Sequence, residues 1–576
     1  MAVPFDVLDF APGVLSGELV ARSHEHNAAV ADKPQVRFLE AHLATLGCQS
    51  MVVEPDYTDR SFLEDYSAYY VRCFEPYGHI CTRLHFFDRP LDRDTLSSAI
   101  VGDDAASLQD HYLGFIVVKP LPSTVIGRTC LRPPRGDGRE FPPIKLQQVD
   151  LYGLRLVVET LPFQEQDREV AACASSALWT MLHSTAHLFQ HAKPSPVEIT
   201  KAATMHARVN GRTFPNGDGL NTLQIADAIR AVGLEPSVLA VSSMKRYAIQ
   251  SEDYAGSQVI PATSEDEDPA FIAKMRMVLK LSVLAYLRSG IACVLLARTS
   301  DQPMVSAGDE YAPDDADPGI EHLDSNADDG ANTVGTDDLI IPRGNHAVAI
   351  TGFVLGEDPG EGYGETSTRF TAGRLERIFV HDDQTGPFTS FVFAEGNRLV
   401  AENYAAPNVA RRLAEPINFV VPLYHKIRIP LSQVLELSVL LDETLGTLPF
   451  TPNLEGEIEW DIQLLGLDAL RDEFAASELP NALKLDLLTS SLPRYVWRVR
   501  AFRKSKPSFD LLLDATDLLQ GKLVRRMIPY ENALCQQIAA IFALTSKFID
   551  PRLGPVIAAF AKADPKTRAT ASSATL

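Results

Sequence analysis

The sequence has no long hydrophobic run. Its 576 residues contain no stretch of about 18 uninterrupted apolar residues, the length that a membrane-spanning helix needs. The longest candidate, residues 284–298, is interrupted by Arg288 and Gly290. The N-terminus places no basic group before an apolar stretch, so no secretory leader is expected. These absences predict a protein that neither crosses a membrane nor enters the secretory pathway.

Cysteines are few and unpaired. The seven cysteines are odd in number and scattered, and no two of them form a Cys-x-x-Cys pair; they are Cys48, Cys73, Cys81, Cys130, Cys173, Cys293 and Cys535. A disulfide framework or a structural zinc site needs regularly spaced pairs. The sequence therefore predicts reduced thiols in a cytoplasmic protein, with no metal and no cofactor.

Basic residues are outnumbered by acidic ones. The chain has 53 Lys and Arg against 75 Asp and Glu, a formal net charge of −22. Nucleic-acid backbones bind basic stripes, so neither nucleic acid nor a membrane surface is expected as a partner. Residues 301–340 hold twelve of the acids and no Lys or Arg, which is more than half of the net charge. This acidic insert is expected to be a solvated, disordered loop; the alternative is a flap over a binding cleft.

Length and composition indicate a globular protein of several domains. Apolar residues make up 45% and charged residues 22%, as in ordinary soluble domains. We expect a mixed α/β region over residues 1–155, a second region over 156–415 that contains the acidic insert, a third α/β region over 416–560, and a disordered tail over 561–576. No internal repeat is visible.

The second region has helices first and strands afterwards. Helices are expected from Cys173 to about Gln190, over 194–207 and over 219–234, and the segment 277–298 predicts a helix, a glycine turn and a buried strand. Strands are expected over 345–356 and, as a pair around a turn, over 377–393. This order is typical of an α+β fold rather than of a repeating βαβ fold.

The flanking regions give weaker patterns. In the first region, residues 37–47 predict a helix and residues 112–122 and 151–162 predict strands. The aromatic-rich segment 65–88 is expected to form the buried face of a sheet rather than a recognition surface.

A possible nucleophile stands where a helix is predicted to begin. Cys173 precedes a run of small and apolar residues, and free N–H groups at a helix N-terminus favour a thiolate. A thiolate nucleophile needs a base, and the base needs an orienting group. His346 at the start of one predicted strand and Asp382 at the end of the next are suited to these two roles, because neighbouring antiparallel strands bring them together.

This arrangement resembles the papain-like cysteine peptidases, and most closely their bacteriocin-processing (C39-like) branch. Three blocks match in order: Cys173 to Trp179, residues 219–234, and Gly344 to Gly352 with Val380-His-Asp382. The likeness covers about residues 163–400. It implies a papain-like core in which a helix bearing the cysteine packs on an antiparallel sheet carrying the histidine and aspartate.

The resemblance also implies a role for each residue. Cys173 would be the nucleophile, His346 the general base and acid, Asp382 the orienting carboxylate and Gln166 the oxyanion donor. Gln166 lies seven residues before the cysteine, whereas the family's glutamine lies six before, and Gln164 lies nine before. Asp383 stands where the family usually has proline, but Asp382 matches the family's V-x-D pattern better.

The expected function is therefore hydrolysis of a peptide or protein by a cysteine peptidase-like enzyme, through a thioester intermediate. Two alternatives remain open: a thiol acyltransferase or deamidase with the same triad, and a non-catalytic binding or scaffold protein on the same fold. His183, His187 and His191, spaced by four residues on the same helix, resemble a zinc pair but lack a further ligand. They are expected to form a solvent-facing row.

Overall fold

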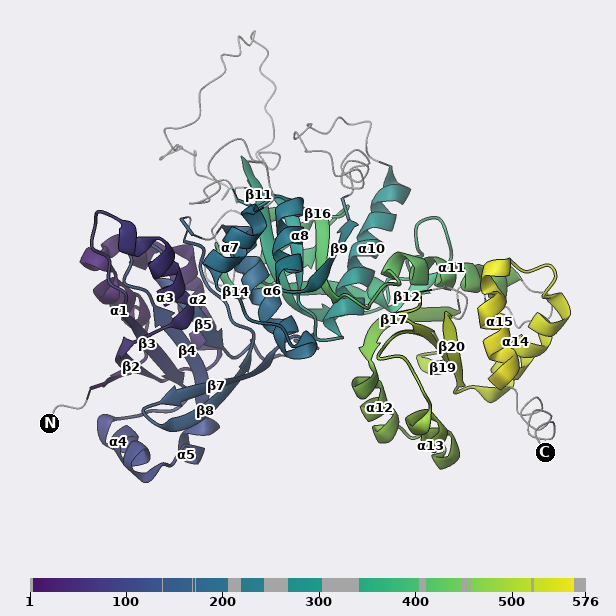
Figure 1. Cartoon of the computed structure of the whole chain (residues 1–576), viewed down its shortest axis with the longest axis horizontal. Helices are drawn as coiled ribbons and strands as arrows, with labels where there is room; N and C mark the ends of the chain where they lie inside the picture. Colours follow the sequence, from purple (N-terminus) through teal and green to yellow (C-terminus); the bar gives the residue numbers. More distant parts are fainter. Residues whose placement is uncertain are drawn as a thin grey trace, which may run out of the picture.

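Figure 1 shows three structural regions in a row, with the N-terminal region at the left and the C-terminal region at the right. The structure is a computed structural model. It describes residues 4–136, 138–167, 169–170, 172–205, 219–242, 268–302, 341–402, 411–447, 454, 457–518 and 523–563. Within these residues no helix is long and apolar enough to cross a membrane.

The N-terminal region is an antiparallel sheet covered on both faces. The five strands lie in sequence order: β1 (Asp6–Asp9), β2 (Ser50–Tyr57), β3 (Cys81–Phe87), β4 (Tyr112–Val118) and β5 (Ile126–Leu131). On one face pack α1 (Val14–Arg22) and α2 (Pro34–Thr45). On the other pack α3 (Arg60–Ala68), α4 (Arg93–Gly102), α5 (Ala106–Gln109) and the hairpin of β7 (Lys145–Leu151) and β8 (Leu154–Thr160). Burial on both faces explains why β4 carries no charged residue and why β3 is buried along its whole length.

The aromatic-rich segment divides between core and surface. Strand β3 is buried along its whole length, as expected for a sheet face. The residues before it are different, because Phe74 is fully exposed and Val71 is half exposed. The expectation that the whole segment is core is therefore wrong for the loop that precedes β3.

Three helices open the middle region where the sequence predicts them: α6 (Cys173–Phe189), α7 (Pro196–Thr204) and α8 (Thr222–Ala231). Two begin with a capping box. In this motif the side chain of the N-cap residue accepts a hydrogen bond from the backbone N–H three residues later, and the side chain of that later residue accepts one from the backbone N–H of the N-cap residue. Ser195 pairs with Glu198 at α7, and Asn221 pairs with Gln224 at α8. These local signals explain why the helix starts can be identified from the sequence.

The centre of the middle region is a closed antiparallel barrel. Its six strands follow one another around the barrel as β10 (Cys293–Gln302), β11 (Ile341–Leu355), β13 (Leu375–Asp382), β14 (Gly386–Phe393), β15 (Leu399–Glu402) and β16 (Arg411–Tyr424), and β16 pairs with β10. Strand β9 (Leu234–Ala240) pairs with the C-terminal half of β16, from Asn418 to Tyr424. Helix α10 (Pro269–Leu287) precedes β10.

The barrel is filled with side chains, and α6 covers its outer surface. The cavity inside, lined by residues that include Val348, Ile378 and Phe391, has a volume of about 10 Å³, which is room for one water at most. On the outside, Leu178 and Trp179 of α6 pack in one cluster with Ala347 and Ala349 of β11. Alternation along β11 therefore directs His346 toward the inside and Ala347 toward α6.

The regions are more interwoven than the sequence indicates. The boundary expected at residue 415 falls inside β16, which belongs to the barrel throughout. Strand β6 (Arg139–Glu140), from the expected first region, pairs with β11. Strand β12 (Arg369–Phe370), from the second, pairs with the C-terminal sheet. Short pairings between distant segments leave no periodic pattern in the sequence.

The C-terminal region is a second antiparallel sheet with helices around it. Its strands are β17 (Ile458–Gly466), β18 (Tyr495–Arg503), β19 (Lys506–Asp514) and β20 (Val524–Pro529), and its helices are α11 (Leu431–Thr447), α12 (Leu467–Ala476), α13 (Asn481–Thr489), α14 (Asn532–Thr545) and α15 (Gly554–Ala563). Short 3-10 turns cover His24–His26, Ala28–Asp32, Tyr70–Arg72, Thr371–Arg374 and Pro551–Leu553. The expectation of a disordered tail over 561–576 is wrong for residues 561–563, which are the end of α15, and the rest of that tail lies outside the described residues.

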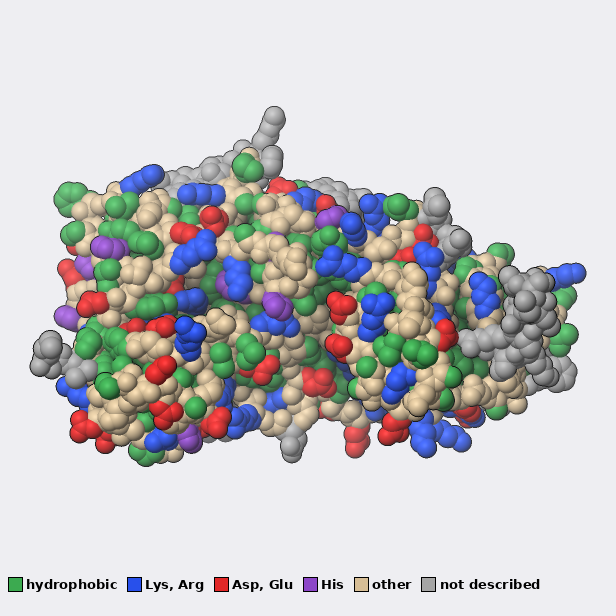
Figure 2. All heavy atoms as spheres, turned by 60° about the horizontal axis from the view of Figure 1, so that its bottom comes forward, with side chains coloured by type: hydrophobic (Ala, Val, Ile, Leu, Met, Phe, Trp, Pro, Cys, Tyr) green, Lys and Arg blue, Asp and Glu red, His purple; other side chains and the backbone are tan. Residues whose placement is uncertain are grey.

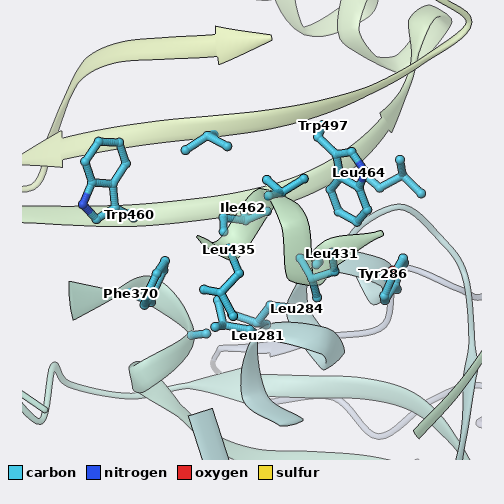
Figure 3. Close-up of a cluster of buried hydrophobic side chains, with 14 of the residues drawn as sticks. Leu281, Leu284, Tyr286, Phe370, Leu431, Leu435, Trp460, Ile462, Leu464 and Trp497 are labelled. Carbon is cyan, nitrogen blue, oxygen red and sulfur yellow. The ribbon is translucent and has the colours of Figure 1, made fainter. Parts of the chain in front are cut away.

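A continuous hydrophobic core joins the barrel region to the C-terminal sheet. Figure 3 shows Leu281 and Leu284 of α10 and Leu435 of α11 facing Trp460 and neighbouring side chains of the sheet. The Trp460 indole donates to Asp442 over 2.7 Å, so its polar atom is satisfied inside the core. The two regions therefore share one core rather than folding as separate domains.

Candidate active site

Helix α6 begins at Cys173 without a side-chain cap. Ala172 occupies the N-cap position, and no side chain of the described residues bonds the end of the helix. The first N–H groups of a helix have no intrahelical partners, so they remain open to an anion beside Cys173. The thiol is partly exposed, and solvent can therefore reach it.

Side chains of two regions hold the segment that leads to Cys173. Asp167 accepts hydrogen bonds from the backbone N–H of Val170 at 2.7 Å and from the hydroxyl of Tyr70 at 3.1 Å. Thr200 of α7 donates its hydroxyl to the carbonyl of Val170 at 2.8 Å and also contacts the hydroxyl of Ser175 at 2.8 Å. The approach to the nucleophile is thus fixed on both sides of Cys173.

His346 of β11 joins the thiol to a carboxylate. Its Nε2 lies 2.9 Å from Oδ1 of Asp382, which is the last residue of β13. The thiol of Cys173 also interacts with this ring and acts to raise the pKa of His346. Because Nε2 is directed at Asp382, we infer that Nδ1 is the nitrogen on the side of the sulfur. The structure therefore brings together Cys173, His346 and Asp382 in the order that a nucleophile, base and orienting group require.

A tight turn holds the carboxylate of Asp382. The backbone N–H of Gln384 donates to Oδ1 at 3.0 Å, and the hydroxyl of Thr385 donates to Oδ2 at 3.1 Å. The guanidinium of Arg412, on β16, lies 3.4 Å from Oδ2. These donors fix the side chain and favour its charged form.

Charge in the site is divided between His346 and Asp382. Burial by itself lowers the pKa of His346, but the Asp382 carboxylate and the hydrogen bonds to Asp382 and Cys173 outweigh it and raise this pKa well above its ordinary value. Burial acts to raise the pKa of Asp382, yet His346 and Arg412 hold it well below its usual range.

Asp383 is a second buried carboxylate at the same ring. Its Oδ1 lies 3.8 Å from Nε2 of His346, and the residue is 3% exposed. Burial raises the pKa of Asp383 to about 7, against the opposing effect of His346. Of the two carboxylates, Asp382 thus has the shorter contact with the ring and the larger set of donors.

Among the described residues, no hydrogen bond joins the glutamine assigned from the resemblance to Cys173, His346 or Asp382. Gln166 is partly exposed in the segment before α6, and Gln164 is buried. Instead the amide nitrogen of Gln384 lies 3.5 Å from Nδ1 of His346. Sequence analysis missed Gln384 and Arg412. The Asp-x-Gln-Thr turn after a strand was the available signal for Gln384.

The other cysteines and the row of histidines differ from this site. Cys73 is also partly exposed, while the remaining five cysteines are buried. The expected solvent-facing row of histidines is wrong at His183, which is only partly exposed and packs against Trp179 with ring centroids 4.2 Å apart. Its Nδ1 bonds the Trp179 carbonyl, and burial lowers the pKa of His183 to about 3. His183 differs from the expectation because it lies on a face of α6 that packs against the protein interior.

The N-terminal region supports the turn from behind. Gln35 of α2 donates its amide to the backbone carbonyl of Asp383 at 2.9 Å. The ring of His42, also on α2, stacks on Phe388 with centroids 6.1 Å apart.

The acidic insert, expected as a loop directly before His346, lies outside the described residues apart from its first two.

Comparison with known proteins finds no match for this chain. Neither a family model, nor a curated protein, nor a solved structure matches the chain. The papain-like core thus remains a prediction from the sequence. The structure itself gives a mixed α/β fold with a six-stranded barrel, and at the start of α6 the partly exposed Cys173 lies beside the buried His346 and Asp382.

Proposed function

We propose that the chain is a cysteine-dependent acyl-transfer enzyme, a peptidase-like hydrolase that acts on a peptide or protein. The observation that supports this most directly is the bonded chain from the Cys173 thiol through His346 to Asp382 at 2.9 Å, with the thiol at the open end of a helix. A buried structural cysteine would need neither the ring nor the carboxylate.

The reaction begins with transfer of the thiol proton to Nδ1 of His346. The thiolate attacks the carbonyl carbon of the substrate, and the open N–H groups at the start of α6 stabilise the oxyanion. When the C–N bond breaks, Nδ1 returns its proton to the leaving amine, and a thioester on Cys173 remains. Water then attacks the thioester and gives a proton to Nδ1, which releases the carboxylic acid and restores the thiol.

Asp382 keeps the ring correctly oriented during these steps and stabilises its positive charge once Nδ1 has taken up a proton. It accepts a hydrogen bond from Nε2–H, so that Nδ1 is the nitrogen available to the sulfur and to the leaving group. Arg412 and the backbone of Gln384 hold the carboxylate in its charged form.

Selective alkylation of Cys173 by iodoacetamide tests the proposal. At pH 6 we expect Cys173 to react much faster than Cys73, which is also partly exposed but bonds only the Tyr69 carbonyl, at 3.8 Å, among the described residues. The buried cysteines are expected to be slower still, since burial raises the pKa of Cys48 and Cys130 to about 12. Peptide mapping by mass spectrometry gives the rate at each residue.

The variant His346→Ala provides the second half of the test. It should bring the rate at Cys173 down to that at Cys73, because the thiol then loses its proton acceptor. Equal rates at the two cysteines in the unaltered protein would refute the enzymatic proposal and favour a binding or scaffold protein. If the thioester is resolved by an added amine faster than by water, the enzyme is an acyltransferase rather than a peptidase.

A further inference from the structure

Three ligand-type side chains converge on one side of the His346 ring. Donor atoms of His346, Asp382 and Asp383 all lie within 4.8 Å of one another, and all three residues are buried. The second such group in the described part of the chain, His24 with Glu25 and Glu75, is at the surface. In the buried group, the proposed roles of Cys173, His346 and Asp382 do not explain why a second carboxylate, that of Asp383, lies beside the ring.

The unexplained group is the carboxylate of Asp383. Its Oδ2 is buried and has no hydrogen-bond partner among the described residues, although the side chain is 97% enclosed. The neighbouring carboxylate of Asp382 has its own partners, because it accepts hydrogen bonds from Gln384, Thr385 and Arg412. A buried carboxylate without a donor is costly, and a bound cation is one way to satisfy it.

The distances suit a small tetrahedral cation. Zinc binds nitrogen and carboxylate oxygen at about 2.0–2.2 Å, so two of its ligands lie about 3.3 Å apart. The structure has Nε2 of His346 at 2.9 Å from Asp382 and at 3.8 Å from Asp383. Changes of about half an ångström at each contact would bring both pairs to that spacing.

We propose that His346 Nε2, Asp382 and Asp383 form a binding site for a divalent cation of the zinc type, which regulates the proposed reaction. An imidazole nitrogen favours zinc over magnesium or calcium, which prefer all-oxygen sites. Two carboxylates and a neutral ring balance the charge of the ion, and water completes the tetrahedron. Arg412 opposes the ion electrostatically, but it contacts Oδ2 of Asp382, whereas the ion contacts Oδ1.

The consequence for catalysis rests on the proposed function. A cation on Nε2 displaces the proton that Asp382 holds there, and the remaining ring proton resides on Nδ1. A neutral ring with Nδ1 already protonated has no lone pair for the thiol proton. The ion would therefore act as a reversible inhibitor, and removing it would restore the base.

Zinc titration against a chromophoric chelator tests the site directly. The protein is first stripped of metal, and His24→Ala is used as the background so that the surface group does not contribute. We expect one Zn²⁺ per chain and a higher melting temperature with zinc. Asp383→Asn is expected to weaken binding at least about tenfold, since even indirect partners of a metal ligand cost that much. Circular dichroism of each variant checks that it folds, and Asp383→Ala serves as a second variant.

Two further variants act as controls. Asp301→Asn removes a buried carboxylate that lies beside Arg412 but outside the cluster, so it should change the affinity less than about threefold. Cys173→Ala should bind zinc as the parent does, because the sulfur faces the other ring nitrogen. Unchanged affinity in both Asp383 variants, or loss of binding in Cys173→Ala, would overturn the site. The titration needs no catalysis, so its outcome is separate from the alkylation test.

Discussion

The carboxylate of Asp382 determines the charge of the His346 ring, and this has a measurable effect at Cys173. In Asp382→Asn the charge that raises the pKa of His346 is lost, while the amide still fills the same space. At pH 6 less of the thiol can pass its proton to the ring. We expect alkylation of Cys173 to slow by about tenfold for each pKa unit that the ring loses.

The variant Asp383→Asn is the control for this prediction, because it removes the neighbouring carboxylate. Asp383 lies 0.9 Å farther from Nε2 than Asp382, at 3.8 Å against 2.9 Å, so Asp383→Asn should have a clearly smaller effect on the alkylation rate at pH 6. Equal effects would mean that the ring uses both carboxylates alike.

The two glutamines near the site are expected to act at different steps. The leaving group takes its proton from Nδ1 in the proposed reaction, and the Gln384 amide nitrogen lies 3.5 Å from that atom. Gln384→Ala should therefore slow acylation by an amide substrate more than acylation by a p-nitrophenyl ester, whose leaving group needs no proton. Burst kinetics with the two substrate types measures the difference.

Gln166→Ala should behave differently if this residue donates to the oxyanion. Both acylation rates would then fall about 100-fold, as is usual for one lost oxyanion donor. Alkylation by iodoacetamide forms no oxyanion and should keep its rate in both variants. An unchanged ester rate in Gln166→Ala would remove this residue from the site.

At the scale of elements, β11 is held in place by a close approach of β6. A Cβ atom on Gly352 would lie 2.7 Å from the Glu140 carbonyl and 2.4 Å from the ring of Phe141. Because backbone cannot move aside as a flexible side chain can, Gly352→Ala should lower the free energy of unfolding by about 1–3 kcal/mol. Gly17→Ala, in α1 with open space around it, is the control and should be neutral or stabilising. Equal effects in urea denaturation would mean that β6 does not constrain β11.

Local signals explain which elements could be predicted. The start of α6 at Cys173, the cap at Asn221 and the two strands that carry His346 and Asp382 all follow from patterns within a few residues. Closure of the barrel by β10 and β16 depends on residues more than a hundred positions apart, such as Val294 and Val420. The support from Gln35 and the contact of Arg412 are likewise long-range, and no periodicity in the sequence signals them.

For the whole molecule, the net charge of −22 does not produce a surface of one sign. Leaving out residues 301–340 reduces the acidic residues from 75 to 63, against 53 basic residues. Figure 2 shows acidic and basic side chains interspersed over one face of the molecule. Surface charge therefore gives no particular pH at which the fold should fail, and the response to acid depends on groups in the interior.

Buried histidines predict that the fold loses stability in mild acid. Burial lowers the pKa of His42 and His85 to about 4 and that of His183 and His381 to about 3. In the unfolded chain these rings titrate near 6.5, so below that pH the unfolded state binds protons that the folded state does not. Stability is therefore lost as pH falls below about 6.5. For four rings, the loss between pH 6 and pH 5 is about 4–5 kcal/mol.

The variant His42→Gln isolates one of these rings. Nε2 of His42 lies 3.0 Å from the Arg132 carbonyl, and a glutamine amide can donate to that same oxygen without titrating. Urea denaturation at pH 5 and pH 6 should then show a pH-dependent loss smaller by about one quarter, since one of four protons is removed from the linkage. His24→Gln, at a partly exposed ring, should leave the loss unchanged. If both variants keep the full loss, protonation of the buried rings is not what destabilises the protein, and the carboxylates that pair in the folded state become the cause to test.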